Sequence, residues 1–295
     1  MFEEEVVEEK LSLIEYHCKE CDAKFYTNDN NKFNKCVICN GIDIEKNDAS
    51  INKNIKLIPF RKTYRDAVSD YTKKVRFNPI VPIVFKNKKN YSTLQKVYVP
   101  VLVTNISRVG DVEFIGGEEG KISDNKILET RRYSILQKVK FNYVDVLLKI
   151  TSKIDDSVFN VINKYDFFSI VDIDSSYLDD SFYLYEDINL KEISTKARND
   201  IDKHSMKIIK SNVKHSLKKV KNDNTIISFE NTRELLVPVY IMRINYRDKE
   251  YSYMMNGESG KSYINLPISS ISVGIFGTII FLITFLISFL ISYFL

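Results

Sequence analysis

The stretch HCKECDAKFYTNDNNKFNKCVICNG, residues 17–41, contains all four cysteines of the chain. They are Cys18, Cys21, Cys36 and Cys39, in the spacing C-x2-C-x14-C-x2-C. Each C-x2-C turn can present two sulfurs to one ion, and four thiolates suit tetrahedral zinc. The middle spacing is one residue shorter than is usual for paired zinc knuckles. The pattern therefore predicts a four-cysteine zinc ribbon at the N-terminal end of the fold.

Two disulfides or idle thiols are the alternative interpretation of these cysteines. The N-terminus, MFEEEVVEEK, is acidic and has no basic segment followed by an apolar one, so we see no secretory signal. A reducing cytosol favours metal ligands over disulfides. His17 is a fifth candidate ligand, although we favour a solvated neighbour. A closed four-cysteine site has no open position for water, so we expect structural Zn2+ without catalysis.

The C-terminal segment predicts a membrane anchor. No charged side chain occurs from Ser262 to Leu295, and residues 271–295, ISVGIFGTIIFLITFLISFLISYFL, are long and apolar enough to cross a bilayer once. Arg247, Lys249 and Lys261 precede this segment, which agrees with the positive-inside tendency. We expect a single-pass protein of the cell membrane, with its body facing the cytoplasm and the bilayer as its first partner.

Small hydroxyl residues recur along this anchor. Thr284, Ser288 and Ser292 are spaced every four residues, which places them on one face of a helix. Ridges of small residues let transmembrane helices approach closely, so self-association is a second expected contact. Hydroxyls without a partner on another helix are the alternative.

Two parts of the body match each other in sequence. VYVPVLVTNI at residues 97–106 matches LLVPVYIMRI at 235–244, and GGEEGK at 116–121 matches NGESGK at 256–261. Between them lie two alternating segments, VGDVEFI and KEYSYMM, which are typical of strands. The sequence therefore predicts an α+β fold with a duplicated antiparallel β unit.

GESGKS, residues 257–262, ends like a phosphate-binding loop. That loop requires its first glycine at position 255, which is Met255, and a helix beginning at the lysine. Residues 262–267 instead predict a short strand that Pro267 ends. We therefore expect a hairpin turn, in which Gly257 and Gly260 supply positive φ angles, and no nucleotide site.

Two helices are expected in the body. Thr63 and Asp66 form a capping-box pattern for a helix that ends near Arg76. Residues 187–221 form the longest helical pattern of the body. Six lysines form one stripe on it, namely Lys203, Lys207, Lys210, Lys214, Lys218 and Lys221. The stripe suits anionic headgroups, nucleic acid or plain solvent, and the lack of interleaved aromatic residues weakens the nucleic-acid interpretation.

These signals divide the chain into four parts. We expect a zinc ribbon with an acidic N-terminus, a first β unit with a connecting segment, a basic helix with a second β unit, and a transmembrane anchor. Their bounds are residues 1–46, 55–180, 181–267 and 271–295. A linker is expected at residues 47–54, NDASINKN.

The composition and motifs offer little support for catalysis. The 43 basic and 39 acidic residues nearly cancel, and neither H-E-x-x-H nor G-x-S-x-G occurs. Three histidines, His17, His204 and His215, are present. Acidic pairs such as Asp155 and Asp156 are more typical of loops than of acid and base catalysts. We expect no catalytic residues and no bound organic cofactor.

The order of these motifs resembles a family of uncharacterised bacterial membrane-associated zinc-ribbon proteins, some labelled as primosomal helicases or transcription-factor-type zinc ribbons. The pieces that carry the resemblance are residues 18–39, Ile58-Pro59-Phe60, Tyr98-Val99-Pro100, Val237-Pro238-Val239 and residues 256–261. The resemblance covers nearly the whole chain and implies a ribbon, β units and a membrane segment. This chain carries no helicase motif. It has Leu102 and Tyr240 where the family often has tryptophan, and one span where the family often has two.

The expected function is that of a membrane-anchored cytosolic zinc-ribbon protein that binds a protein partner, as an interaction or scaffold module. The alternative is a nucleic-acid-binding membrane protein that uses the ribbon and the lysine-striped helix. An enzyme with an unrecognised carboxylate site is the least favoured class.

Overall fold

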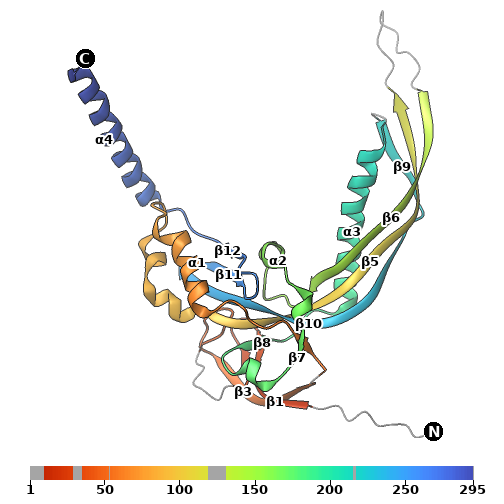
Figure 1. The fold of residues 1–295 in the computed structure, drawn as a ribbon, viewed down its shortest axis with the longest axis horizontal. Helices are drawn as coiled ribbons and strands as arrows, with labels where there is room; N and C mark the ends of the chain where they lie inside the picture. Colours follow the sequence, from red (N-terminus) through yellow and green to blue (C-terminus); the bar gives the residue numbers. More distant parts are fainter. Residues whose placement is uncertain (1–9, 29–34, 53, 119–130, 215–216, 295) are drawn as a thin grey trace, which may run out of the picture. The chain divides into compact units, whose positions relative to one another are not determined.

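The structure, a computed structural model, describes residues 10–28, 35–52, 54–118, 131–214 and 217–294 (Figure 1). In these residues the chain has a mixed α+β fold, in which twelve strands are hydrogen-bonded into one sheet. The chain forms two compact units. Unit 1 comprises Met1–Pro100, Thr151–Glu186 and Leu235–Leu295, and unit 2 comprises Val101–Ile150 and Asp187–Glu234. Two long strands, β5 (Gln95–Glu118) and β10 (Ile226–Tyr246), contribute to both units.

In unit 1, the cysteines lie beside a three-stranded antiparallel segment. β1 (Lys10–Cys18) pairs with β2 (Lys24–Thr27) on one side and with β3 (Ile44–Asn52) on the other. The predicted linker at residues 47–54 is wrong as far as Asn52, because those residues pair with β1. The acidic N-terminus, residues 1–9, lies outside the described residues.

Unit 1 also contains the strands that precede the apolar C-terminal segment. β10 turns back into β11 (Lys249–Asn256), and β11 pairs with β12 (Ser262–Ile264), which confirms the predicted short strand. Arg247 and Asp248 make the two-residue hairpin turn with φ angles of 51° and 57°. Three short strands complete this part of the sheet, namely β4 (Lys56–Leu57), β7 (Val171–Asp172) and β8 (Phe182–Leu184).

Helix α1 (Tyr64–Arg76) packs against β10 and β11. It begins with the predicted capping box, in which the Thr63 hydroxyl accepts a hydrogen bond from the Asp66 N–H at 3.2 Å and the Thr63 N–H donates to the Asp66 carboxylate at 2.8 Å. Tyr71 of α1 and Tyr253 of β11 meet edge to face in this core. The predicted helix is therefore confirmed, and its apolar face covers the strands that lead to the C-terminal segment.

Five further short helices of unit 1 lie within the part of the chain that the structure describes. They are η1 (Ile83–Lys86), η2 (Lys88–Thr93), α2 (Asp156–Ile162), η3 (Phe167–Ser169) and η4 (Ser175–Leu178). The first two follow α1, and Phe85 of η1 packs between Tyr246 and Tyr251 at the hairpin end of β10 and β11.

Unit 2 is a sheet with one helix on one of its faces. β6 (Arg131–Lys149) pairs antiparallel with β5, and β9 (Leu217–Asp223) pairs with β5 over residues 112–117. Helix α3 (Leu190–Asn212) covers one face, where Val112 and Phe114 are buried with Ile209. Successive side chains of a strand alternate between faces, so Val109 and Ile115 belong to the opposite face, where both are exposed.

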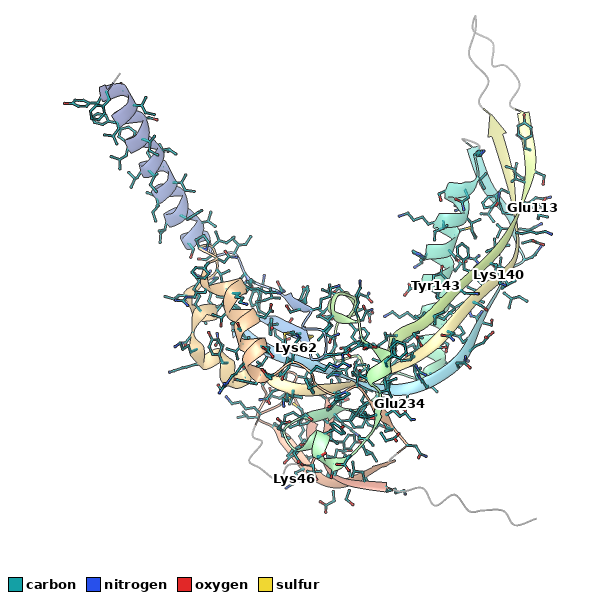
Figure 2. The ribbon with its side chains drawn as sticks, viewed as in Figure 1. Lys46, Lys62, Glu113, Lys140, Tyr143 and Glu234 are labelled. Carbon is teal, nitrogen blue, oxygen red and sulfur yellow. The ribbon has the colours of Figure 1, made fainter. Side chains whose placement is uncertain are left out.

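The same division of faces holds for β6. The ring of Tyr143 lies 6.1 Å from that of His204 on α3, whereas Lys140 is exposed; both Tyr143 and Lys140 are labelled in Figure 2. Leu136 and Val144 are also exposed, at 62% and 70%. Apolar side chains therefore remain uncovered on the face of this sheet that α3 does not pack against.

The long basic helix predicted over residues 187–221 is wrong in its last part. α3 ends at Asn212, and residues 217–223 form β9 instead. Val220 still reaches the apolar cluster that contains Ile209 and Val213, but it does so from a strand paired with β5. The apolar residues whose spacing predicted one long helix therefore belong to two elements, α3 and β9. The predicted lysine stripe does not form on a single helix. His215 lies outside the described residues.

The chain takes a different course after each of the two matching segments, residues 97–106 and 235–244. Residues 109–115, predicted as a separate second strand, continue β5 without a reversal, whereas residues 249–255 form β11 after the turn at Arg247 and Asp248. Gly110 does take a positive φ of 144°, but a Cβ there would lie 2.4 Å from the Asn224 carbonyl oxygen. This glycine therefore makes room for the turn after β9 and does not reverse the chain. Residues 119–121 of the first GGEEGK motif lie outside the described residues.

Arg108 of β5 joins the elements of unit 2, although it is only 1% exposed. Its guanidinium donates hydrogen bonds to Thr225 Oγ1 at 2.9 Å, Ser205 Oγ at 2.5 Å and the Asp223 carboxylate at 2.5 Å. A second carboxylate, that of Asp202, lies 2.9 Å away. Since these partners come from α3 and from the end of β9 and the turn after it, one side chain ties three elements together.

Arg108→Ala should lower the free energy of unfolding by roughly 2 to 4 kcal/mol, because it leaves two carboxylates and two hydroxyls without their donor. The lower part of this range allows for the solvent that reaches Asp202, which is half exposed. Urea unfolding of the detergent-solubilised chain, followed by circular dichroism, measures the change. Arg132→Ala, at an exposed position of the same unit, is the control. Equal effects of the two substitutions would contradict the role given to Arg108.

Candidate metal centre and glycine turn

The four cysteine sulfurs converge at the end of β1. All four Sγ atoms lie within 4.8 Å of one another, and the Cys18–Cys39 and Cys21–Cys36 pairs are each 3.6 Å apart. A disulfide needs a separation of about 2.05 Å, so these are free thiols. Tetrahedral ligands at about 2.3 Å from an ion are separated by about 3.8 Å. The cluster therefore has the donor set and spacing to hold one metal ion.

The two C-x2-C turns have the same backbone design. The N–H of the first cysteine in each donates to the carbonyl five residues later, from Cys18 to Ala23 at 2.9 Å and from Cys36 to Gly41 at 2.8 Å. The residue after the second cysteine has a positive φ in both, 55° at Asp22 and 60° at Asn40. Aspartate and asparagine tolerate this conformation better than most residues, which explains why these types suit those positions.

Backbone N–H groups also point at the sulfurs. The Ile38 N–H lies 3.3 Å from Cys36 Sγ, and the Gly41 N–H lies 3.3 Å from Cys39 Sγ. Such donors stabilise thiolates, the form that binds metal.

The cysteines differ in their tendency to ionise. A hydrogen bond from Cys36 lowers the pKa of Cys21 to about 5, while the same bond raises the pKa of Cys36 far above its ordinary value. Burial raises the pKa of Cys39 to about 11. Without a cation, the cluster therefore shares protons among its sulfurs, because several adjacent thiolates repel one another.

Two charged side chains of the first cysteine turn, Lys19 and Glu20, have partners in the segment after Cys39. Lys19 forms an ion pair with Glu45 at 2.5 Å, and the Glu20 carboxylate accepts from the Ile42 N–H at 2.8 Å. Both contacts link the first cysteine turn to the segment after the second. Lys19 and Glu45 remain half exposed, so this ion pair lies at the protein surface.

His17 contacts Asp22 and not the sulfurs. Its Nε2 lies 2.7 Å from the Asp22 carboxylate, and this hydrogen bond lowers the pKa of Asp22. The structure thus brings together the four predicted cysteine ligands and gives the fifth candidate, His17, a different partner.

Two side chains from later in the chain anchor the cysteine turns. Lys153 Nζ donates to the Cys21 carbonyl at 3.0 Å, and Asn40 Nδ2 donates to the Arg243 carbonyl at 3.1 Å. Arg243 in turn donates to the Lys153 carbonyl at 3.0 Å. Sequence reasoning did not identify these contacts, because Lys153 and Arg243 are more than 100 positions away from the cysteines and belong to no motif.

Asn256, which begins the glycine turn between β11 and β12, is fully buried. Its side-chain amide donates to the carbonyls of Ile162 at 2.7 Å and Lys164 at 2.9 Å. Its side-chain oxygen accepts the N–H groups of Glu258 and Ser259, both at 2.8 Å. The amide group thereby closes the turn and attaches it to the end of α2.

The remaining N–H groups of this turn are also occupied. The Gly257 N–H donates to the Pro238 carbonyl at 2.8 Å, and the Gly260 N–H donates to the Asn256 carbonyl at 2.9 Å. A phosphate-binding loop works by aiming free N–H groups at the anion. The prediction that GESGKS forms a turn is therefore confirmed, and the N–H groups that a phosphate loop would leave free are used within the protein.

The carboxylate of Glu258 is buried in the same turn, with a side chain that is 3% exposed. It accepts the Asp166 N–H at 2.7 Å and the Ser169 hydroxyl at 3.0 Å. Arg61 lies 3.5 Å away. A carboxylate in this turn would repel an anion brought close to it, which disfavours phosphate binding here.

The two glycines of this turn serve different purposes. Gly260 has a φ of 77°, as predicted. Gly257 is not in the left-handed region, so the prediction for it is wrong. A Cβ on Gly257 would lie 2.4 Å from the Phe60 ring and 2.9 Å from Pro238 Cβ. This glycine is needed for space.

A polar cluster near the start of β12 links that strand to α1. Ser262 Oγ donates to the Asp70 carboxylate at 2.6 Å and lies 2.5 Å from Lys74 Nζ, while the Tyr253 hydroxyl donates to the same carboxylate at 2.9 Å. A serine beside a lysine resembles a nucleophile beside its base. Here, however, Lys74 is the ion-pair partner of Asp70 at 3.5 Å. The cluster is therefore explained as a structural contact between β12 and α1.

Helix α4 (Ser270–Phe294) is the candidate membrane span. Ser272–Phe294 has a mean hydropathy of 2.6, and none of its most apolar window is buried in the protein. It is long and apolar enough to cross a membrane. The Thr284 hydroxyl donates to the Ile280 carbonyl of its own helix at 3.0 Å.

Among known proteins, the chain is similar to the Bacillus subtilis (strain 168) protein described as "Uncharacterized protein YdjG". The two are 23% identical over 222 residues, which make up 72% of this chain and 64% of that protein. The chain thus spans less than two thirds of the length of this relative. No protein-family model and no solved structure matches the chain. The resemblance to a zinc-ribbon family stays a prediction.

Cys36→Ser should reduce the bound metal of the purified chain from about one ion per chain to a small fraction of that, because three thiolates and a hydroxyl hold a thiophilic metal ion far less tightly. His17→Ala is the matched variant, and we expect it to retain its metal. Plasma mass spectrometry of the detergent-solubilised chain gives the content. Loss of metal in His17→Ala, or its retention in Cys36→Ser, would contradict the assignment of ligands.

Gly257→Ala should lower the free energy of unfolding by about 1 to 3 kcal/mol, because its Cβ overlaps the Phe60 ring. In Gly274→Ala, on α4, the new Cβ meets no atom within 4 Å, so this variant should unfold like the original chain. Urea unfolding in detergent compares the two. A Gly257→Ala chain as stable as Gly274→Ala would show that the turn is looser than described.

Proposed function

We propose that this chain is a single-pass membrane protein with its body in the cytoplasm, a structural zinc ribbon, and a surface that binds a protein partner. The observation that carries the proposal is α4, an apolar helix that buries none of its most apolar window within the protein. In water such a surface is unfavourable, and a bilayer is the environment that accommodates it. The bilayer is thus the first partner.

Zinc is the metal that we propose for the cysteine cluster. Four thiolates with tetrahedral spacing select zinc or an iron–sulfur centre, and the tight spacing of the sulfurs fits a single ion. The two matching turns and the strands β1, β2 and β3 support a ribbon. The zinc would stabilise this part of the fold, because four cysteines leave it no position for substrate.

The orientation of the anchor rests on charge. Arg247, Lys249 and Lys261 precede α4, and cytoplasmic flanks are enriched in such residues. A cytoplasmic body also agrees with four reduced cysteines.

The uncovered face of the unit 2 sheet is where we propose that the protein partner binds. It exposes Val109, Ile115, Leu136 and Val144, of which Leu136 and Val144 are the most exposed. Apolar side chains gathered on one face are typical of surfaces that bind other proteins. We propose binding without catalysis, as an interaction or scaffold module.

Self-association through Thr284, Ser288 and Ser292 remains part of the proposal. The Thr284 hydroxyl already has an acceptor in its own helix. Association would therefore depend on close packing of small residues and not on a hydrogen bond from Thr284 to a second helix.

An internal duplication is also proposed, on the sequence match alone. The two matched decamers both lie in strands, β5 and β10. The chain takes a different course after each decamer, so a duplication would have been followed by divergence of the second strand.

The nucleic-acid alternative has a weaker basis once the lysine stripe is divided. Lys203, Lys207 and Lys210 are exposed on α3, but Lys221 belongs to β9 and is paired with Glu113 at 2.7 Å. Salt-dependent binding of DNA or RNA by the purified chain would favour this alternative.

Cross-linking in intact cells, followed by recovery of the tagged chain from membranes that resist alkaline carbonate, tests the proposal. We expect a specific protein to be recovered, and we expect Leu136→Glu with Val144→Glu to reduce its yield at least about tenfold, since a buried unpaired charge is costly. Lys203→Glu with Lys207→Glu, at exposed positions of α3 and outside the proposed face, is the matched control for charge. Extraction by carbonate would refute the anchor, and equal recovery with all variants would refute the binding face.

A further inference from the structure

The segment between α1 and η1 lies against the start of the candidate membrane helix. The Ser269 N–H donates to the Ile80 carbonyl at 2.9 Å, one residue before α4 begins. Figure 1 shows α1 and the segment after it beside the first turn of α4. If α4 crosses a bilayer, as proposed above, this segment lies at the membrane surface.

Large apolar side chains are exposed in this segment. Phe77 is 80% exposed, Ile83 is 81% exposed and Val84 is 42% exposed. Ile268, next to the Ser269 contact, is 69% exposed. We name these four residues the interfacial patch. The exposure of these apolar side chains to water is unfavourable, and contact with an apolar partner would remove it.

The backbone of the segment that carries the patch is fixed by buried side chains and a buried hydrogen bond. Val81 and Phe85 are buried in the core formed by α1, β10 and β11. The Tyr71 hydroxyl, itself buried, donates to the Phe85 carbonyl at 2.7 Å. Because Val81 and Phe85, which flank Ile83 and Val84, are fixed in the core, these two side chains cannot turn inward without breaking that packing.

The segment that carries most of the patch is basic in sequence. Residues 71–110 contain no aspartate or glutamate. The basic residues within their first part are Lys73, Lys74, Arg76, Lys86, Lys88 and Lys89. Arg76 lies over the Phe77 ring at 5.4 Å, and Lys88 and Lys89 are exposed on η2. An apolar centre with a basic rim is the pattern of a surface that sits in the headgroup region of an anionic bilayer.

We propose that the interfacial patch docks into the anionic headgroup region of the bilayer that α4 crosses, with Phe77 and Ile83 at the level of the acyl chains and Arg76, Lys86, Lys88 and Lys89 on the lipid phosphates. The inference rests on the proposed membrane anchor. It adds a second, lipid-selective contact, which fixes the body on the membrane surface and makes its position depend on anionic lipid.

The chain has no tryptophan, so a single introduced tryptophan reports on its own surroundings. Three full-length variants, Phe77→Trp, Phe281→Trp and Phe168→Trp, would be reconstituted into vesicles of phosphatidylcholine with brominated acyl chains, with and without phosphatidylglycerol. Phe281 lies on α4 and tests the anchor. Phe168 is fully exposed on η3, beside Asp166, and serves as the matched control away from the patch.

We expect bromine to quench Phe281→Trp in both lipids, and Phe77→Trp by roughly twofold or more when phosphatidylglycerol is present, with weaker quenching in phosphatidylcholine alone. Phe168→Trp should show little quenching. Quenching of Phe281→Trp without quenching of Phe77→Trp would overturn docking while leaving the anchor intact. Quenching of Phe77→Trp and Phe168→Trp to the same extent would overturn it as non-specific adsorption. If Phe281→Trp is not quenched, the anchor fails, and docking fails with it.

The charge requirement has its own test in the Phe77→Trp background. Lys88→Gln with Lys89→Gln should reduce the quenching in phosphatidylglycerol vesicles towards its value in phosphatidylcholine. Lys203→Gln with Lys207→Gln removes the same charge from exposed positions on α3 and should leave it unchanged. An equal loss with both pairs would mean that overall charge, and not the basic rim, attracts the lipid, and would overturn the proposed role of these lysines.

Discussion

The buried side-chain amide of Asn256 is the contact on which much of unit 1 depends. It makes four hydrogen bonds, two as donor to the end of α2 and two as acceptor within the glycine turn, so none of its polar capacity is lost on burial. Arg108 has the comparable position in unit 2, where its guanidinium joins β5, α3 and the turn after β9. In each unit a polar side chain specifies which elements meet, while apolar packing supplies most of the stability. A fully satisfied polar contact accepts only one arrangement of its partners.

The parts of the fold that could be predicted from the sequence are those determined by residues close together in the chain. The cysteine spacing, the capping box at Thr63, the strand before Pro267 and the apolar C-terminal helix all depend on residues a few positions apart. The predictions from sequence were wrong where residues far apart in the chain determine the local structure. Residues 217–223 have lysines at helical spacing but pair with β5, and residues 47–52 have the composition of a loop but pair with β1. Strand partners are supplied by the rest of the chain, and composition alone does not reveal them.

For the candidate sites, the sequence supplied the ligands and the structure supplied their surroundings. The motif identified the four cysteines, but not Lys153 and Arg243, which connect the cysteine turns to the body. Arg108 comes directly after an uncharged stretch, residues 97–107, a pattern that suits a charge with buried partners, yet those partners are about 100 positions away. GESGKS shows the converse case. Its resemblance to a phosphate loop is limited to residue types, and the structure uses the same N–H groups to close a turn around Asn256.

The hydrogen bond from the Asn40 side chain to the Arg243 carbonyl also constrains when the cysteine cluster can be completed during synthesis. The cysteines leave the ribosome early, but the carbonyl that holds their second turn belongs to a strand synthesised about 200 residues later. Metal could bind the early cysteines while they are still supported only by their own strands. The finished site must wait for β10, and β10 is followed within a few dozen residues by α4. The cysteine cluster can therefore be completed only shortly before α4, the candidate membrane span, is synthesised.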